Sequence, residues 1–518
     1  MSVKPYQHEA VLDFGVPAHR AAMKTALGEV RQRLGRYYPL VVGGKRIATD
    51  EEILSTNPSQ PDEVVGRVGK AEPQHIDRAL DAGWEAYHRW RRVAPSERAR
   101  VLYRAAALMR QRRFELDAWE ILEAGKPWAE ADADVAEAID FLEYYGRQME
   151  RLAHPVELVP LPDEDDVAFY QPLGVGVIIP PWNFPLAILT GMASAAIVAG
   201  NAVLLKPASP TPVLGALFVE IMEAAGLPPG VLNFVPGDGG RIGDYLVQHP
   251  HTRFISFTGS RDVGLRINRL AAEPQPGQRW IKRVVAEMGG KDAIIVDETA
   301  NLEAAAQGIV VSAFGFQGQK CSACSRAIVV ESVYDQVLAR VRELTEALRI
   351  GPPEDGENQL GPVIDHRALD KILGYISWGK QHATLVTGGR RVERPGYFLE
   401  PTIFSDVAPG SKIEQEEIFG PVLAFIRVRD FDEALAVAND TDYGLTGSVY
   451  SARRDRIQRA ALEFEVGNLY INRQCTGAIV GAHPFGGFNM SGTDAKTGSP
   501  DYLLQYLQMK AVAERLSP

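Results

Sequence analysis

Cys321 is the side chain in this sequence whose type and setting most favour covalent chemistry. It ends the stretch Gly-Phe-Gln-Gly-Gln-Lys-Cys at 315–321. Only a thiolate is a strong nucleophile, so a reactive cysteine needs some access and positive or dipolar groups nearby. Gly315 and Gly318 have no Cβ and let the backbone approach a ligand closely, and we expect the neighbouring Lys320 to lower the thiol pKa. A buried structural cysteine is the alternative that these residues leave open.

The spacing of Cys321 and Cys324 also matches the Cys-x-x-Cys pattern of redox dithiols and zinc sites. A structural zinc site usually needs four ligands in paired spacings, and this sequence has no second Cys-x-x-Cys. A redox pair normally opens a helix in a small βαβ domain, whereas this pair lies deep in a long chain. We therefore expect neither a metal nor dithiol chemistry here.

Two further polar side chains follow apolar runs that are typical of strands. Asn183 lies in Pro-Pro-Trp-Asn-Phe-Pro at 180–185, after the run 174–179, and Lys206 lies in Leu-Leu-Lys-Pro-Ala-Ser at 204–209. Ligands of open α/β sheets bind beyond the carboxyl ends of the strands. There an amide can stabilise an oxyanion, and a lysine can reach a ribose or phosphate. A local cap in a proline-rich turn and a lysine that extends to solvent are the competing interpretations.

A strand that runs into a glycine turn and then a helix is predicted at 257–264, Phe-Thr-Gly-Ser-Arg-Asp-Val-Gly. The first turn of such a helix offers free N–H groups and a positive dipole end to a pyrophosphate. Gly259 and Gly264 supply one glycine fewer than the dinucleotide fingerprint requires. A plain strand-to-helix turn therefore stays open.

Two glutamates are candidates for proton transfer and for sugar binding. Glu287 precedes Met-Gly-Gly-Lys, and its carboxylate can act as a general base toward water if its environment tunes the pKa. Glu417, in Glu-Glu-Ile-Phe-Gly-Pro at 416–421, can accept hydroxyls of a ribose while Phe419 packs against a flat ring. A hinge with a solvated glutamate, and a surface glutamate beside a core phenylalanine, are the structural alternatives.

Strands and helices alternate over most of the chain, which predicts βαβ units with parallel sheets. Strands are expected at 174–179, 202–205, 231–235, 253–257 and 284–286, then at 293–296, 325–330, 422–427 and 467–471. Helices are expected at 186–200, 213–225, 301–314, 332–349 and 431–439, and earlier in 74–113, which Pro95 divides, and 129–149. Two consecutive α/β sections predict two domains joined near 287–290.

Composition limits the class of protein and its partners. The chain has 518 residues, of which 46% are apolar and 23% charged, as in ordinary globular proteins. Its net charge of −11 disfavours nucleic acid and anionic membranes as partners. We find no apolar run long enough for a membrane helix and no export signal. Three cysteines fit a reducing compartment, so we expect a cytoplasmic protein.

Taken together and in this order, the motifs resemble those of the aldehyde dehydrogenase superfamily over roughly residues 40–510. The matching pieces are PWNFP, LLKPAS, FTGS, EMGGK, GQKC and EEIFGPV. The resemblance implies an α/β fold with two Rossmann-like parallel-sheet domains and an extended β oligomerisation arm. It implies Cys321 as the nucleophile, Asn183 and the Cys321 backbone N–H as the oxyanion hole, and Glu287 as the base for thioester hydrolysis.

The same resemblance implies a nicotinamide cofactor and its contacts. Lys206 would bind the adenosine ribose, Ser260 the pyrophosphate, and Glu417 with Phe419 the nicotinamide riboside. The other residues expected at the cofactor are Ile179, Pro180, Trp182, Ser209 and Gly259. Many NAD-preferring relatives carry Glu where Ser209 stands, and that glutamate would repel a 2′-phosphate. Ser209 leaves NADP use open, although NAD is expected.

Longer stretches, 473–480 and 483–493 among them, resemble the 1-pyrroline-5-carboxylate dehydrogenase subfamily. That resemblance implies oxidation of L-glutamate γ-semialdehyde to L-glutamate, the step after proline oxidation. A turn at Thr476-Gly477-Ala478 can aim N–H groups at the substrate carboxylate. The substrate contacts expected in all are Ser322, Gly477, Ala478, Phe485, Phe184, Glu137 and Lys320. A dehydrogenase for another small semialdehyde, such as succinate semialdehyde, and a non-catalytic relative are the alternatives.

The expected division of the chain has four parts. They are a helical extension at 1–35, an NAD-binding domain at 36–154 and 171–286, a catalytic domain at 287–488, and an oligomerisation arm at 155–170 and 489–518. The arm and the family resemblance imply a homo-oligomer, either a dimer or a hexamer built from dimers.

Overall fold

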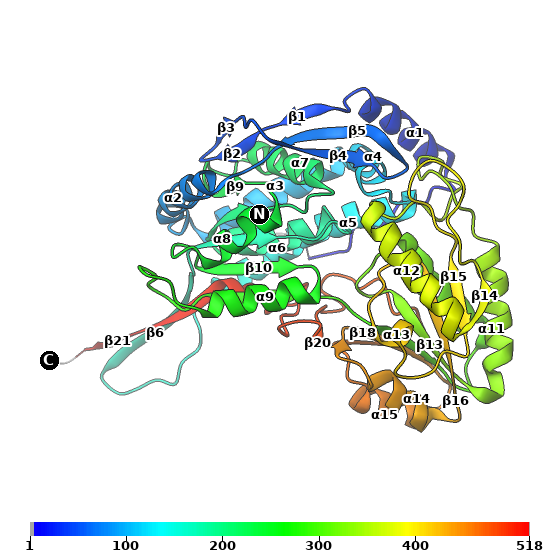
Figure 1. Cartoon of the computed structure of the whole chain (residues 1–518). Helices are drawn as coiled ribbons and strands as arrows, with labels where there is room; N and C mark the ends of the chain where they lie inside the picture. Colours follow the sequence, from blue (N-terminus) through cyan, green and yellow to red (C-terminus); the bar gives the residue numbers. More distant parts are fainter. Residues whose placement is uncertain (1–4, 517–518) are drawn as a thin grey trace.

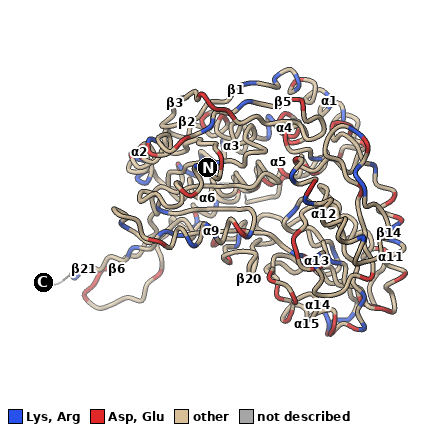
Figure 2. Tube along the Cα trace, viewed as in Figure 1, with Lys and Arg blue, Asp and Glu red and all other residues tan. Residues whose placement is uncertain are grey.

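The computed structural model describes residues 5–516. Residues 1–4 and 517–518, which belong to the expected extension and arm, lie outside the described part of the chain. Figure 1 shows two main bodies and a thin projection that ends near the C-terminus. Lys and Arg are interspersed with Asp and Glu along the trace (Figure 2).

The first body is built on a seven-stranded sheet in the order β11-β10-β7-β8-β9-β2-β3. Neighbours from β11 to β9 are parallel, while β2 pairs antiparallel with β9 and β3. The strands are β2 (Leu40–Val42), β3 (Lys45–Ile47), β7 (Val175–Ile179), β8 (Ala202–Leu205), β9 (Leu232–Phe234), β10 (Phe254–Thr258) and β11 (Arg283–Glu287). The helices around them are α2 (Pro73–Trp90), α3 (Pro95–Gln111), α4 (Arg113–Ala124), α5 (Trp128–Leu152), α6 (Ala187–Val198), α7 (Pro212–Ala224), α8 (Asp244–Gln248) and α9 (Arg261–Ala272).

The second body repeats this plan with the strand order β14-β15-β16-β13-β12-β18-β19. Its neighbours are parallel except at the β14 edge, which is antiparallel to β15. The strands are β12 (Asp292–Val296), β13 (Cys324–Val330), β14 (Thr384–Thr387), β15 (Thr402–Ser405), β16 (Val422–Val428), β18 (Thr446–Tyr450) and β19 (Asn468–Ile471). The helices are α10 (Leu302–Phe314), α11 (Glu331–Glu346), α12 (His366–His382), α13 (Lys412–Gln415), α14 (Phe431–Asn439) and α15 (Arg454–Glu463). The expected α/β class with two parallel sheets is confirmed.

Three small sheets complete the fold. Two lie within the bodies: β1 (Arg36–Tyr38), β5 (Gln60–Gly69) and β4 (Glu52–Asn57) form one, and β17 (Tyr443–Gly444) with β20 (Phe488–Asn489) forms another. The third pairs β6 (Glu164–Pro172) with β21 (Leu507–Arg515) in an antiparallel ribbon. This ribbon is the projection in Figure 1.

The ribbon is shorter than the arm expected at 155–170 and 489–518. Residues 155–163 form a loop, and β21 begins only at Leu507. The preceding 3-10 helix, Tyr502–Tyr506, is fixed in the first body because both tyrosines are buried there. Tyr502 stacks on Tyr145, and Tyr506 meets Phe254 edge-on.

The N-terminal extension is helical only over α1 (Pro17–Arg31), which buries Met23, Leu27 and Val30. Residues 5–16 have neither helix nor strand and run along the first body. Within residues 5–516, no helix combines the length and the apolar character that crossing a bilayer requires.

Candidate active site

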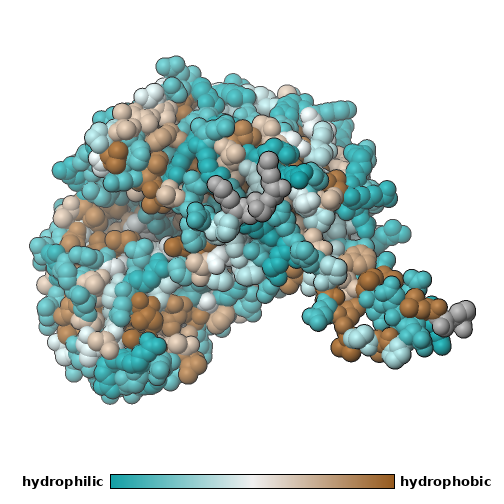
Figure 3. All heavy atoms as spheres, turned by 180° about the vertical axis from the view of Figure 1, so that it is seen from behind, coloured by the Kyte–Doolittle hydropathy of each residue, from teal (hydrophilic) through white to brown (hydrophobic). Residues whose placement is uncertain are grey.

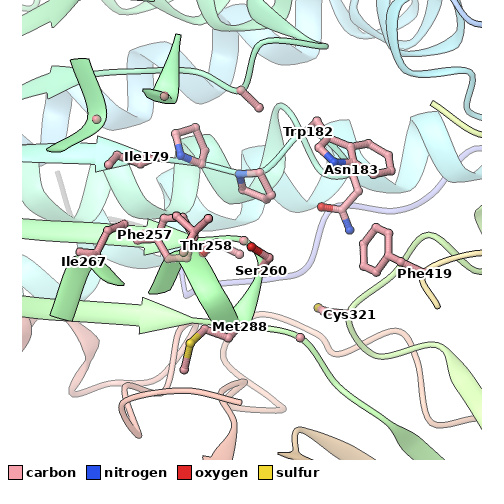
Figure 4. Close-up of a pocket in the computed structure, with 18 of the residues that line it drawn as sticks. Ile179, Trp182, Asn183, Phe257, Thr258, Ser260, Ile267, Met288, Cys321 and Phe419 are labelled. Atoms are coloured by element: carbon pink, nitrogen blue, oxygen red, sulfur yellow. The ribbon is translucent and has the colours of Figure 1, made fainter. Parts of the chain in front are cut away.

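Cys321 lies where two cavities meet. One cavity has a volume of about 830 Å³ and the other about 450 Å³, both within the range of small-molecule sites. Cys321 and Met288 line both cavities, so a molecule in either one can reach the sulfur. Figure 4 looks into the larger cavity, with Cys321 below the loop that carries Asn183.

The loop before Cys321 has an unusual backbone. Phe316, Gln317 and Gly318 have φ angles of 49°, 57° and 67°, and a Cβ on Gly318 would collide with the carbonyl oxygen of Gly420. Non-glycine residues hold such angles only where the surroundings fix them. Gln317 Nε2 donates to the Pro362 carbonyl at 2.7 Å, which supplies one such restraint. The strained turn therefore delivers Cys321 at a fixed place.

The environment of Cys321 raises the pKa of its thiol. Burial is the main cause, and the carboxyl groups of Asp292 and Glu417 add to it. The Lys320 ammonium pairs with Glu130 at 2.7 Å. The thiol pKa is therefore raised on balance, although the Lys320 ammonium stands next to the cysteine in the chain. The resting sulfur therefore keeps its proton to higher pH than an exposed thiol does.

Asn183 lies in the loop that follows the carboxyl end of β7 and leads into α6. Its Nδ2 donates to the Gln319 carbonyl at 2.9 Å, two residues before the cysteine. The amide points toward the side of the cavity that holds Cys321 and Phe419 (Figure 4). An amide nitrogen has two hydrogens, so one N–H remains for a ligand oxygen close to the sulfur.

Glu287 ends β11 and lines the smaller cavity. Its Oε2 accepts a hydrogen bond from the Gly487 N–H at 3.3 Å, while Oε1 is buried without a partner among the described residues. A Cβ added to Gly486 or Gly492 would lie 3.2 or 3.1 Å from Oε1, so these glycines leave room for the carboxylate. Burial raises its pKa well above the usual value.

The larger cavity collects polar groups from strand ends of the first body. Lys206 follows β8 and is 6% exposed, and within the described chain its Nζ has one hydrogen bond, to Pro207 O at 3.4 Å. Burial lowers the pKa of this amine to about 8. Ser260 precedes α9 without capping it through its side chain, which leaves the N–H groups of the first turn for a ligand.

The second body closes this cavity with Glu417 and Phe419. Glu417 Oε1 accepts from the Gly290 N–H at 3.2 Å, and a Cβ on Gly289 would clash with the same carboxylate. The Phe419 ring meets Trp182 edge-on at 5.5 Å between centroids. The larger cavity therefore suits a dinucleotide, which has phosphates, ribose and a flat ring. It offers the buried amine of Lys206, the free N–H groups of α9, the carboxylate of Glu417 and the ring of Phe419.

Eight of the nine residues expected at the cofactor line the larger cavity: Ile179, Pro180, Trp182, Lys206, Gly259, Ser260, Glu417 and Phe419. Ser209 is not brought to them. It lies on an exposed turn just beyond Ala208, the last lining residue of that stretch.

The smaller cavity gathers all seven residues expected at the substrate: Glu137, Phe184, Lys320, Ser322, Gly477, Ala478 and Phe485. Gly477 has a φ of 76°, and the Arg473 guanidinium holds the turn by donating to the carbonyls of Thr476 and Gly477, each at 3.0 Å. Burial raises the pKa of Glu137 to about 8. Lys126 Nζ lies 4.4 Å from the centre of the Phe184 ring and pairs with Asp134 in a buried ion cluster.

Sequence reasoning missed the contribution of residues 5–16 to this cavity. His8, Glu9 and Val11 line it, together with Asp140 of α5. The segment belongs to the expected helical extension, but residues 5–16 form neither helix nor strand. Its contacts join residues more than 100 positions apart, so no local pattern could have found them.

Comparisons with known proteins agree with this geometry. The model of the aldehyde dehydrogenase family matches residues 46–512. A 1-pyrroline-5-carboxylate dehydrogenase of Geobacillus kaustophilus is 59% identical over 99% of both chains. A crystal structure of 1-pyrroline-5-carboxylate dehydrogenase from Thermus with bound NAD has a TM-score of 0.98 and 54% identity, over 99% of this chain and 100% of that one. Proline utilization A of Bdellovibrio bacteriovorus has a TM-score of 0.97 and 45% identity over 99% of this chain and 54% of that one.

Proposed function

The chain belongs to the aldehyde dehydrogenase family, and we propose that it oxidises L-glutamate γ-semialdehyde to L-glutamate with NAD in proline catabolism. One observation carries the proposal. Cys321 stands at the junction of a cavity suited to a dinucleotide and a smaller one lined by groups that suit the charged end of an amino acid. The relatives from Geobacillus kaustophilus and Thermus described above bear the name 1-pyrroline-5-carboxylate dehydrogenase, which supports this substrate.

The chemistry follows from three side chains. The Cys321 thiolate attacks the aldehyde carbon, and the free N–H of Asn183 with the Cys321 backbone N–H stabilises the oxyanion of the thiohemiacetal. A nicotinamide dinucleotide held in the larger cavity would supply the hydride acceptor that oxidation of this adduct to a thioester requires. Glu287 then takes a proton from water, the water oxygen attacks the thioester carbonyl, and the cysteine sulfur leaves.

The smaller cavity supports the amino-acid substrate over simpler aldehydes. We propose that the N–H groups around Gly477 and Ala478, with the Ser322 hydroxyl, bind the α-carboxylate. Glu137 faces the same space and would accept the α-ammonium, directly or through water. Phe184 and Phe485 would flank the carbon chain. A succinate semialdehyde has a carboxylate but no ammonium, so it would leave Glu137 buried without a partner.

We also propose the remaining contacts and the assembly. Lys206 would bind the adenosine ribose, the first turn of α9 at Ser260 the pyrophosphate, and Glu417 with Phe419 the nicotinamide riboside; Ser209, outside the cavity, leaves NADP use open. Residues 36–154 and 171–286 would form the cofactor domain, 287–488 the catalytic domain, and the β6–β21 ribbon an arm for a homo-oligomer. A cytoplasmic location fits the three unpaired cysteines.

A substrate panel tests the proposal directly. We expect kcat/KM for glutamate γ-semialdehyde, measured by NADH formation, to exceed that for succinate semialdehyde by about a hundredfold, since one buried charge-assisted contact is lost in the latter. Equal or reversed values would reject the assigned substrate while leaving the aldehyde dehydrogenase chemistry intact.

The nucleophile has its own test. Cys321→Ala is expected to abolish NADH formation and to keep NAD affinity within twofold, because the sulfur forms the thioester but holds little of the dinucleotide. Cys324→Ser is the matched control, since Cys324 is buried away from both cavities and should stay largely active. Turnover by the alanine variant, or an inactive serine variant, would contradict the assignment.

A further inference from the structure

We propose that residues 6–12, called here the N-terminal strap, form the mouth of the substrate cavity and set which aldehydes it accepts. The inference rests on the proposed function and concerns the same cavity. His8, Glu9 and Val11 line that cavity, yet the side chain of Val11 is 66% exposed. Residues that face both solvent and the cavity stand at its opening.

The strap is fastened to α5 through two buried carboxylates. The Glu9 N–H donates to Asp140 Oδ1 at 2.8 Å, and the Leu12 N–H donates to Asp132 Oδ2 at 2.6 Å. Arg113 bridges the same parts, because its guanidinium binds Asp132 and donates to the Ala10 carbonyl at 2.8 Å. Hydrogen bonds to ionised acceptors are stronger than neutral ones. The strap is therefore held in one position as part of the cavity wall, although it has no regular secondary structure.

The strap is also fastened to the opposite wall. Tyr6 Oη donates to the Val480 carbonyl at 3.3 Å, and His8 Nε2 lies 3.0 Å from the same oxygen, so its N–H is the donor. Val480 ends the turn 477–480, whose N–H groups we assign to the substrate carboxylate. The Tyr6 ring packs edge-on against Tyr144 of α5 at 5.2 Å. The strap thus ties the turn to the helix that carries Glu137.

The charged side chain of the strap, that of Glu9, is paired with two arginines. The Glu9 carboxylate pairs with Arg110 at 2.8 Å and lies 3.5 Å from Arg113. His8 is the strap group with a polar edge toward the cavity, beside Asp140. A mouth of this kind narrows the entrance without placing an unpaired charge beside a zwitterionic substrate.

Two effects follow from this arrangement. The strap holds the turn 477–480 in place and so favours substrates with an α-carboxylate. Removal of its hydrogen bonds to the turn should raise KM for these substrates. A narrow mouth disfavours long aldehydes, so a wider mouth should raise kcat/KM for them. Neither effect reaches the chemical step, because within residues 5–516 no strap residue hydrogen-bonds to Cys321, Asn183 or Glu287. The strap residues are positioning and specificity residues, not catalytic ones.

The first experiment uses the double variant Tyr6→Phe/His8→Ala, with Lys24→Ala on the exposed face of α1 as the matched control. We expect KM for glutamate γ-semialdehyde to rise about tenfold, with KM for propanal, kcat and the NAD Kd each within twofold of the parent. A tenfold change corresponds to about 1.4 kcal/mol, the size expected for two lost hydrogen bonds. Equal increases for both aldehydes, or no increase for either, would overturn the role of the strap in holding the turn.

The second experiment does not depend on the amino-acid substrate. In His8→Ala we expect the ratio of kcat/KM for hexanal to that for propanal to rise at least threefold, because the mouth is wider. An unchanged ratio would overturn the role of the strap in selecting by length. If the unmodified protein does not prefer glutamate γ-semialdehyde, the proposed function fails, but the hexanal ratio still decides whether the strap forms the mouth.

Discussion

The environment of Glu287 disfavours the ionised carboxylate that a general base needs. The carboxyl group is 7% exposed, and within residues 5–516 only one N–H, that of Gly487, donates to it. Burial raises its pKa well above the usual carboxyl value, so it keeps its proton to higher pH than an exposed glutamate does. A general base must be ionised, and its ionised fraction grows as pH rises through the raised pKa. The rate of thioester hydrolysis should therefore increase as pH rises through this raised pKa and level off above it.

Replacement of this carboxyl separates the two halves of the reaction. In Glu287→Gln the hydride step can still occur, but water is no longer activated, so we expect a burst of about one NADH per subunit. Steady turnover should then be slower by about 10²–10⁴-fold, the usual contribution of a general base, and its rise with pH should disappear. Stopped-flow absorbance measures both phases.

Glu273→Gln, an exposed glutamate after α9, is the control and should turn over like the parent. A Glu287→Gln enzyme that is slow from the first turnover, with no burst, would place this glutamate before the hydride step, in the activation of Cys321.

At the scale of elements, the sequence predicts what local chemistry determines. The helix expected at 213–225 is α7, and the apolar runs before Asn183 and Lys206 form β7 and β8 with little error in their ends. Because both strands are parallel, both side chains reach one edge of one sheet, which is why residues far apart in the chain could be predicted to share a site. The same logic brings Ser260 to that edge.

Other parts of the molecule depend on contacts that no local pattern records. The strands β4 and β5 carry mixed polar and apolar residues because they form a half-exposed sheet, so they lack a clear apolar run. The strap is defined by hydrogen bonds to Asp140 and Val480, which lie 131 and 472 residues from their partners. The raised thiol pKa of Cys321 likewise comes from packing, and the adjacent Lys320 could not reveal it.

The N-terminus of α9 gives a prediction at this scale. Val263 lies in the first turn and lines the larger cavity. A negative charge there favours the helix but repels a pyrophosphate at the same dipole end. Val263→Glu should therefore raise KM for NAD about tenfold at low salt without lowering the melting temperature.

Val263→Gln has nearly the same shape and no charge, so it should raise KM for NAD much less. The difference between the two variants should shrink at 0.5 M salt because exposed charges are screened. Equal effects of Glu and Gln at low salt would mean that shape, and not the helix end, governs cofactor binding here.

At the scale of the whole molecule, the two bodies contribute different residues to the site, and the ribbon is part of neither. The first body supplies the strand ends at the cofactor cavity, the second supplies Cys321 and Glu417, and the surface is hollowed between them when seen from behind (Figure 3). The ribbon projects from this pair and carries exposed apolar side chains, among them Val167, Phe169, Met509 and Val512. An isolated two-stranded ribbon is marginally stable in water, so the face that carries Val167, Phe169 and Val512 supports the homo-oligomer proposed above.

Charge on that face should break the assembly. Val167 and Val512 are paired across the ribbon and exposed by 45% and 40%. We expect Val167→Asp/Val512→Asp to give the mass of a monomer in analytical ultracentrifugation, because two carboxylates would be desolvated in any contact. Leu54→Asp, on β4 far from the ribbon in Figure 1 and 58% exposed, is the control and should keep the parent mass. An unchanged mass in the double variant would show that subunits join through another surface, and a shift in the Leu54→Asp control alone would place that surface on the three-stranded sheet.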